Sequence, residues 1–164
     1  MVPVDDFGLI RIDDRLIHGQ VIAGWVTHLR FTRVIILDDE VAADSFLRQV
    51  LRLAAPPELR VEVYPIAEGI RLLGQDAASR KSTMILLKTP LAARRLFDEG
   101  LPYAALNIGG IGHKPGRKNV FKNISASSEE IAIFRYLVGK GVRITLLTVP
   151  GEQSQDFAAL ANRL

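Results

Sequence analysis

The segment Asp13–Gln20 holds the densest group of reactive side chains in this sequence. It contains two carboxylates, Asp13 and Asp14, followed by the guanidinium of Arg15 and the imidazole of His18. An arginine offers a forked donor to phosphate oxygens, and a neutral imidazole is a nucleophile that can accept a phosphoryl group near neutral pH. These residue types indicate an anion site at which His18 could carry a phosphoryl group.

A stripe of apolar residues at helical spacing follows this segment directly. It comprises Val21, Ile22, Trp25, Val26 and Leu29. The start of such a helix has unpaired backbone N–H groups and a partial positive charge, so the backbone at Gly19 and Gln20 would favour a bound anion. The same residue types also fit an ordinary helix start, at which an aspartate caps the helix and His18 is merely polar. The local pattern leaves both interpretations open.

The signatures of several other chemistries do not occur. The sequence has no cysteine and contains no G-x-x-x-x-G-K-[ST], G-x-S-x-G or H-E-x-x-H motif. Gly110 and Gly112 do not complete a dinucleotide fingerprint, because Pro115 stands where the third glycine should fall. Binding of a nucleotide or another anion by the loop Gly109–Gly116 stays an alternative that calorimetric titration with nucleotides can test.

Short extended runs alternate with amphipathic stretches along the whole chain. We expect strands over residues 7–12, 33–37, 59–64, 82–88, 103–108 and 142–149. Strands that alternate with helices imply right-handed crossovers and parallel pairing. The prediction is an α/β fold in one domain, residues 1–164, with an open, twisted, mostly parallel sheet and helices on both faces. Ligands of such sheets bind beyond the carboxyl ends of the strands, where Asp13–Gln20 lies.

Local signals mark several helices and one irregular stretch. Thr89 is expected to cap a helix that ends at Gly100, and Ser127–Glu130 fits a capping box. We expect Phe46, Leu47, Val50, Leu51 and Ala54 to form the core face of one helix. Residues 109–123 are expected to form a surface loop with at most a short strand, and a terminal helix is expected from residue 154 onward.

The composition excludes several classes of protein. The 164 residues are 48% hydrophobic and 24% charged with a net charge of +3, which is typical of a soluble globular domain. No apolar run approaches the roughly 18 residues of a membrane-spanning helix, and the first residues lack the features of a secretory signal. No block of five or more basic residues marks a nucleic-acid site. We therefore expect a cytoplasmic protein that binds no nucleic acid.

The string Arg11–Val21, with Trp25 following, resembles the signature of a known bacterial family. It is similar to the IIB components of the mannose/fructose/sorbose family of the phosphoenolpyruvate-dependent sugar phosphotransferase system. The resemblance covers essentially the whole chain, because Asp38–Asp44, Ala55–Pro57 and Asn107–Gly110 occur in the order and spacing of that family. The residue that matches the phosphorylated histidine of the family is His18.

The resemblance implies a phosphoryl relay. The IIB domains of this family take a phosphoryl group from a phosphohistidine on a IIA domain and pass it to a sugar presented by the membrane subunits IIC and IID. It implies no metal or other cofactor, a cytoplasmic protein bound peripherally to the permease, a separate IIA chain as donor, and association into homodimers. Arg15 matches the active-loop arginine and is assigned charge stabilisation of the phosphoryl group. Asp14 is assigned to orient the imidazole or hold the loop, with Asp13 as second candidate.

Other residues receive supporting or structural roles. Thr89 and the backbone of Gly109 and Gly110 end two strands and face the same cleft if the strand order places them beside Asp13–Gln20. Trp25 is expected in the core with a partner for its N–H group, and Asp38–Glu40 as an acidic helix cap rather than as magnesium ligands.

The long loop and the destination of the phosphoryl group leave alternatives open. His28 and His113 are expected at the surface. The basic residues Lys114, Arg117, Lys118 and Lys122 form either a rim that meets an acidic or phosphorylated partner or a merely solvated surface. A regulatory module that is phosphorylated but never donates to a sugar is the alternative function, because the loop chemistry is the same in both.

Overall fold

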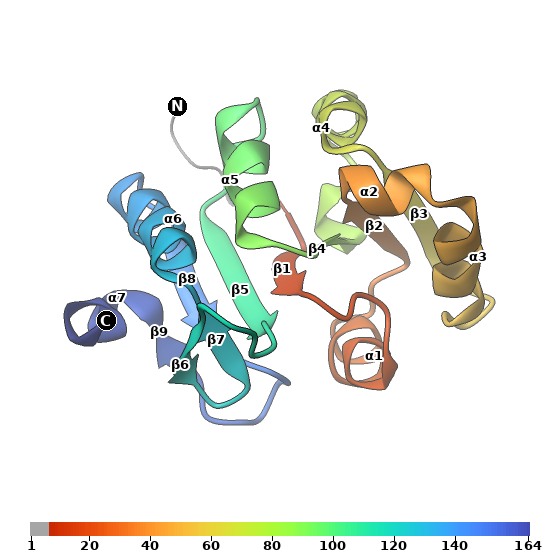
Figure 1. Ribbon diagram of the computed structural model, residues 1–164. Coiled ribbons are helices and arrows are strands. Elements are labelled where there is room, and N and C mark those ends of the chain that lie inside the picture. The colour runs from red at the N-terminus through yellow and green to blue at the C-terminus, as the bar shows by residue number, and fades with distance from the viewer. Residues whose placement is uncertain (1–6) are drawn as a thin grey trace.

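A seven-stranded sheet forms the centre of the computed structural model, which describes residues 7–164 (Figure 1). The strand order is β3-β2-β4-β1-β5-β8-β9. The strands are β1 Leu9–Asp13, β2 Arg33–Leu37, β3 Arg60–Tyr64, β4 Thr83–Leu87, β5 Ala105–Gly110, β8 Arg143–Leu146 and β9 Gln155–Asp156. All neighbouring strands pair in parallel except β8 and β9. The predicted α/β class with a mostly parallel sheet is confirmed.

Helices cover both faces of the sheet because the central strands are apolar on both sides. One face packs against α4 (Ile66–Gln75), α5 (Pro90–Asp98), α6 (Ser128–Gly139) and α7 (Phe157–Leu160). The other face packs against the π-helical segment Val21–Val26, which continues into α1 (Thr27–Leu29), and against α2 (Asp39–Ala43) and α3 (Ser45–Leu53). Short 3₁₀ turns at Arg80–Ser82 and Ala161–Arg163 complete the chain, with a hairpin of β6 (Lys118–Phe121) and β7 (Ile124–Ala126).

The central place of β1 determines where a site can form. β1 pairs with β4 on one side and with β5 on the other. The chain therefore leaves β4, β1 and β5 at the same edge of the sheet, and it continues from there into different layers. Ligand sites of open α/β sheets lie at such a point, where the strand order reverses.

The helix caps follow the sequence signals. The hydroxyl of Thr89 accepts from the backbone N–H of Ala92, and Gly100 has the positive φ of +138° that ends the helix. Ser127 and Glu130 form the predicted capping box. Asp38 accepts from the N–H of Val41 and thereby caps α2, as expected for this acidic segment.

The predicted core face of residues 46–54 is wrong in part. Phe46 and Val50 are 74% and 42% exposed, and the helix packs inward through Leu51 and partly through Leu47. The apolar residues of α3 form two neighbouring columns, Phe46, Val50 and Leu53 in one and Leu47 and Leu51 in the other, and only the second column faces the core. Apolar spacing alone therefore did not identify the buried side.

Four further boundaries differ from the prediction. The helix after Gly19 starts as a π-helical turn, and the last strand is shorter, ending at Leu146. The stretch after Ile108 is more ordered than predicted, because β5 continues to Gly110 and β6 and β7 form a hairpin. The terminal segment adds the antiparallel strand β9 before the short α7.

Two expectations concern membranes and secretion. Among residues 7–164 there is no helix long and apolar enough to cross a bilayer. The expectation that the first residues carry no signal sequence concerns Met1–Asp6, which lie outside the described residues.

Candidate functional site

The loop between β1 and the π-helical segment is fixed at several points. The backbone N–H of Asp14 donates to the carbonyl of Gly110 at 3.0 Å, and that of Leu16 donates to the carbonyl of Asp13 at 3.0 Å. Leu16 has a positive φ of 59°, which is unusual for a leucine and costs about 1–3 kcal/mol. Its side chain is buried in the core beside Ile17, and this burial holds the strained conformation in place. The turn is therefore a rigid support for the residues that follow.

His18 is held by a buried carboxylate. Its Nε2 lies 2.9 Å from Oδ2 of Asp13, which is fully buried, whereas the imidazole keeps 15% of its surface exposed. Within the described part of the chain, Nδ1 makes no hydrogen bond. With Asp13 ionised, Nε2 carries the hydrogen and the lone pair of Nδ1 is free to act as a nucleophile.

Arg15 lies at the mouth of a cleft beside this loop. Its side chain is 53% exposed, with Nε 3.8 Å from Oδ1 of Asp13, and one terminal nitrogen donates to Oε1 of Gln20 at 3.0 Å. The cleft has a volume of about 520 Å³. Its walls include Asp14, Arg15, Gln20, Gly110, Asn123 and Thr148, and Lys122 and Glu152 form an ion pair on its far side at 3.5 Å.

The two roles considered for the aspartates, orienting the imidazole and holding the loop, are divided between them. Asp14 does not contact His18; its Oδ2 accepts from the backbone N–H of Gly112 at 2.8 Å and so ties the loop to the end of β5. Asp13 is the residue that contacts the imidazole. Asp13 is the last residue of β1 and Asp14 begins the turn that follows it, and their side chains reach different partners.

The remaining predicted residues surround the loop at different distances from His18. Gly110 accepts from Asp14 and lines the cleft. Thr89 lies on the other side of Asp14, in a hollow of about 310 Å³ that also includes Lys88 and His113. The guanidinium of Arg11 packs against Gly109, whereas Gly19 is exposed with open space around its Cα. The strand order thus brings Thr89, Gly109 and Gly110 beside the loop, but Thr89 does not line the cleft that Arg15 lines.

Sequence reasoning missed a buried polar cluster under the loop. Arg11 is fully buried on β1 and donates to Oδ2 of Asp13 at 3.0 Å, to Oδ1 of Asn107 at 2.6 Å and to the carbonyls of Leu147 and Thr148 at 3.0 and 2.9 Å. The signal was present, because an arginine in an otherwise apolar strand must be paired. Its partners lie up to 137 residues away along the chain, so the sequence did not identify them.

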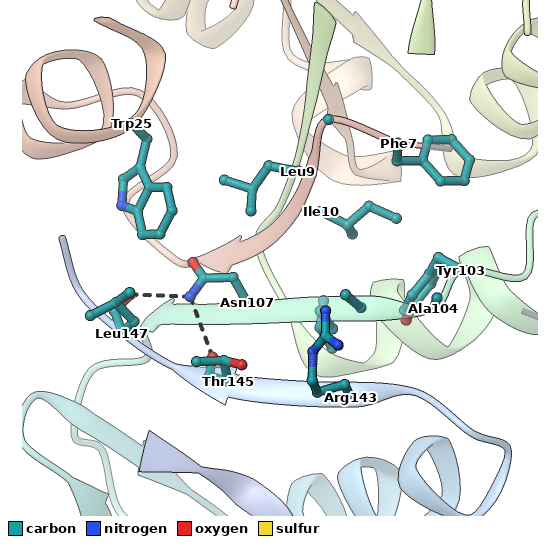
Figure 2. A pocket seen from close by; sticks show the side chains of 13 residues that line it. Phe7, Leu9, Ile10, Trp25, Tyr103, Ala104, Asn107, Arg143, Thr145 and Leu147 are labelled. Carbon is teal, nitrogen blue, oxygen red and sulfur yellow. Dashed lines mark hydrogen bonds between the residues drawn. The ribbon is translucent and has the colours of Figure 1, made fainter. Parts of the chain in front are cut away.

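The cluster continues to both sides of Arg11. The ring of Trp25 lies over the guanidinium at 5.0 Å, and its N–H donates to the carbonyl of Thr148 at 2.8 Å, which confirms the expected partner. The hydroxyl of Thr148 donates to Asn123, whose amide reaches the carbonyl of Gly109 at 3.4 Å. Asn107 also borders a separate hollow of about 280 Å³ over β5 and β8, where its amide points to the carbonyls of Thr145 and Leu147 (Figure 2).

Burial and pairing act in opposite directions on Arg11. Burial lowers the pKa of Arg11, and the charge of Asp13 with its hydrogen bond raises it, leaving a pKa below the ordinary value.

Within residues 7–164 no group of three or more His, Asp or Glu side chains is placed to hold a metal ion.

Comparison with known proteins identifies the class to which this fold and site belong. A family model described as "PTS system sorbose subfamily IIB component" matches residues 7–163. The crystal structure of the IIBSor domain of the sorbose permease from Klebsiella pneumoniae has a TM-score of 0.87 and 34% sequence identity, covering 96% of each chain.

Curated relatives agree with this match. The sorbose-specific EIIB component of Klebsiella pneumoniae is 35% identical over 149 residues, which are 91% of each protein. The mannose-specific EIIAB component of Escherichia coli K12 is 33% identical over 96% of this chain but only 49% of its own length, so this chain spans about half of that relative. The chain therefore belongs to the sorbose subfamily of IIB components.

Proposed function

We propose that this chain accepts a phosphoryl group on Nδ1 of His18 and passes it to a sugar during uptake. The observation that carries this proposal is the contact of Nε2 with the buried Asp13, because it leaves Nδ1 as the free nucleophilic nitrogen. The donor is the phosphohistidine of a IIA protein, and the acceptor is a hydroxyl group of a sugar held by the membrane subunits IIC and IID.

Three features of the geometry support this proposal. As Nδ1 bonds to phosphorus, the bond from phosphorus to the donor nitrogen breaks, and positive charge develops on the His18 ring. Asp13 lies next to Nε2 and stabilises that charge. Arg15 is at the cleft mouth, where its fork can bind the equatorial oxygens of the phosphoryl group and spread their charge. Asp14 faces away from His18 toward Gly112, so it does not repel the phosphate.

The partners of this chain follow from the same proposal. A IIA protein and the IIC/IID permease must both reach His18, which fits a cytoplasmic protein that associates peripherally with the membrane. Of the four basic residues in the long loop, Arg117 is paired with Glu130 at 2.7 Å and Lys122 with Glu152 at 3.5 Å. Lys118 donates to the carbonyl oxygen of Leu164 at 2.9 Å, so Lys114 is the candidate to meet an acidic partner. The family resemblance implies that two copies of the chain form a dimer. Light scattering, which measures the molar mass in solution, tests this prediction.

Phosphorylation of the isolated chain tests the assignment of His18. We expect incubation with phosphorylated IIA to add one phosphoryl group, which mass spectrometry under alkaline conditions locates on His18. His18→Ala should abolish the uptake. His28→Ala is the matched control, because His28 is exposed at the end of α1, and it should leave uptake unchanged. Uptake by the His18→Ala variant would refute the assignment.

The destination of the group requires a second assay. Membranes that contain IIC and IID should release phosphorylated sugar when supplied with the phosphorylated chain. The regulatory alternative predicts a stable phosphoprotein and no sugar phosphate under the same conditions. The relatives named above are described as mannose-specific and sorbose-specific components, which favours transfer to a sugar.

A further inference from the structure

Arg11 is a buried cation directly beneath the nucleophile. Its two terminal nitrogens make four hydrogen bonds, to Asp13, Asn107 and the two carbonyls at the end of β8. Space for the guanidinium exists only because residue 109 is glycine: a Cβ there would lie 1.8 Å from Cζ of Arg11. Hydrogen bonds to β1, to β5 and to the segment after β8, together with the space left by Gly109, fix the guanidinium in one position.

One oxygen of Asp13 joins Arg11 to His18. Oδ2 lies 3.0 Å from Arg11 and 2.9 Å from Nε2 of His18, and both the guanidinium and the carboxylate are fully buried. With Arg11 positive, Asp13 negative and His18 neutral, the net charge of the three groups is zero. Without Arg11, a lone buried carboxylate would be left beside the imidazole, and it would draw a second proton onto the ring. A ring with two protons has no lone pair for a phosphoryl group.

We propose that Arg11 is a positioning residue for phosphoryl transfer: its buried charge balances Asp13, so that His18 stays neutral with hydrogen on Nε2 and a free lone pair on Nδ1. Arg11 touches no substrate in this role. It acts through Asp13, and its position is set by Asn107 and by the carbonyls of Leu147 and Thr148.

Other charges face the imidazole from the surrounding elements. Arg15 lies near Asp13 but is half exposed, with Nε 3.8 Å from Oδ1, so solvent screens it. Asp14 is directed to Gly112, and Lys122 and Glu152 pair with each other across the cleft. Arg11 is therefore the one fully buried cation among the described charges around His18.

Nuclear magnetic resonance of the ¹⁵N-labelled His18 ring tests this role without any phosphoryl donor. The role of Arg11 rests on the proposed transfer at His18. The titration of the ring is measured without that transfer, so its outcome is independent of the outcome of the transfer assay. We expect the midpoint of the ring titration to rise by about one pH unit or more in Arg11→Met. Arg11→Lys, which keeps the charge, should titrate close to the unsubstituted protein.

A double substitution and a matched control separate charge from structure. In Arg11→Met combined with Asp13→Asn the cluster is neutral again, so the midpoint should fall back below that of Arg11→Met. Arg33→Met is the control, because Arg33 is also paired with carboxylates but begins β2, at the amino ends of the parallel strands, whereas His18 follows the carboxyl end of β1. It should leave the His18 midpoint unchanged. An unshifted midpoint in Arg11→Met, or a shift that Asp13→Asn does not reverse, overturns the proposal.

The unsubstituted protein provides a test that does not depend on the folding of Arg11→Met. The proposal requires that neutral His18 carry its hydrogen on Nε2, since an ionised Asp13 can only accept. A hydrogen on Nδ1 would mean that Asp13 is protonated and donates to Nε2, and it would refute the role of Arg11. In the transfer assay, the pH profile of phosphoryl uptake by Arg11→Met should move to higher pH, and Arg11→Lys should restore it.

Discussion

Arg11 and Arg33 are both arginines of the central sheet that pair with carboxylates, but they lie at opposite ends of their strands and differ in burial and in partners. Arg33 begins β2 and binds Glu62, Asp76 and the hydroxyl of Ser79, in part at the surface. Arg11 lies within β1, is fully buried, and shares its carboxylate with His18.

The surroundings of the two arginines shift their pKa in opposite directions. Hydrogen bonds to Glu62 raise the pKa of Arg33, whereas burial lowers the pKa of Arg11. The pair at Arg33 joins elements at the amino ends of the strands, and the pair at Arg11 prepares a reactive side chain at the carboxyl ends. An ion pair of the same type thus supports structure in one place and chemistry in the other, according to what else its carboxylate contacts.

The largest contrast is expected when the carboxylate of each pair is neutralised. Asp13→Asn replaces the charged acceptor beside Nε2 of His18 with a neutral amide that can also donate and no longer fixes the ring hydrogen, and we expect the rate of phosphoryl uptake to fall by at least about 100-fold. Glu62→Gln should leave this rate unchanged, because Glu62 contacts Arg33, Arg60 and Tyr64 only within the structural cluster. Rapid-quench measurements with phosphorylated IIA compare the two, and similar rates in both variants would contradict the comparison.

The exposed arginine of the loop comes next in expected effect. Arg15→Ala removes the fork at the cleft mouth and should slow uptake by roughly 100-fold, as loss of one donor to a developing anion does elsewhere. Arg15→Lys should recover part of the rate. Arg94→Ala, which removes an exposed arginine of α5 paired with Asp98, serves as control. An Arg15→Ala protein as fast as this control would exclude phosphate contact by Arg15.

Glycine substitutions distinguish the two regions by stability and activity together. A Cβ at Gly109 would lie 1.8 Å from Cζ of Arg11, and one at Gly69 would lie 2.1 Å from Cδ2 of Leu37. Both Gly109→Ala and Gly69→Ala should lower the free energy of unfolding by about 1–3 kcal/mol in denaturant titrations. Only Gly109→Ala should also slow phosphoryl uptake beyond what its unfolded fraction explains, because it displaces Arg11. Equal uptake by the folded fractions of both variants would argue against a role for Arg11.

The smallest effect concerns acid stability at the Arg33 end. Burial would raise the pKa of Glu62, but hydrogen bonds from Arg33 and Tyr64 and nearby positive charges outweigh it, so its pKa lies below the usual value. The stabilisation is therefore present above the unfolded-state pKa of about 4.3 and is lost as the pH falls through the lower folded-state value. Glu62→Gln should flatten the acid limb of a stability profile measured by urea titration. An acid limb as steep as that of the unsubstituted protein would show that Glu62 contributes little.

Local signals in the sequence predicted much of the fold because local interactions decide it. The β-branched run at residues 33–37, the cap at Thr89 and the capping box at Ser127 each depend on neighbours within a few residues. The side of α3 that is buried could not be predicted, because apolar residues lie on two neighbouring sides of this helix and contact with the sheet selects one of them.

The sequence names the residues of the candidate site but not their geometry. The density of reactive side chains pointed to the loop Asp13–Gln20, but the choice between Asp13 and Asp14 as the partner of His18 required the direction in which each side chain leaves the backbone. Arg11 finds its partners in β5 and after β8, and that assembly exists only in the folded sheet.

The nitrogen that carries phosphorus is the most direct test of this site. After phosphorylation by IIA, ¹⁵N and ³¹P magnetic resonance of the His18 ring should show the phosphoryl group on Nδ1, with hydrogen retained on Nε2 beside Asp13. Phosphorus on Nε2, or on any residue other than His18, would contradict the arrangement in which a buried carboxylate holds one ring nitrogen and leaves the other to react.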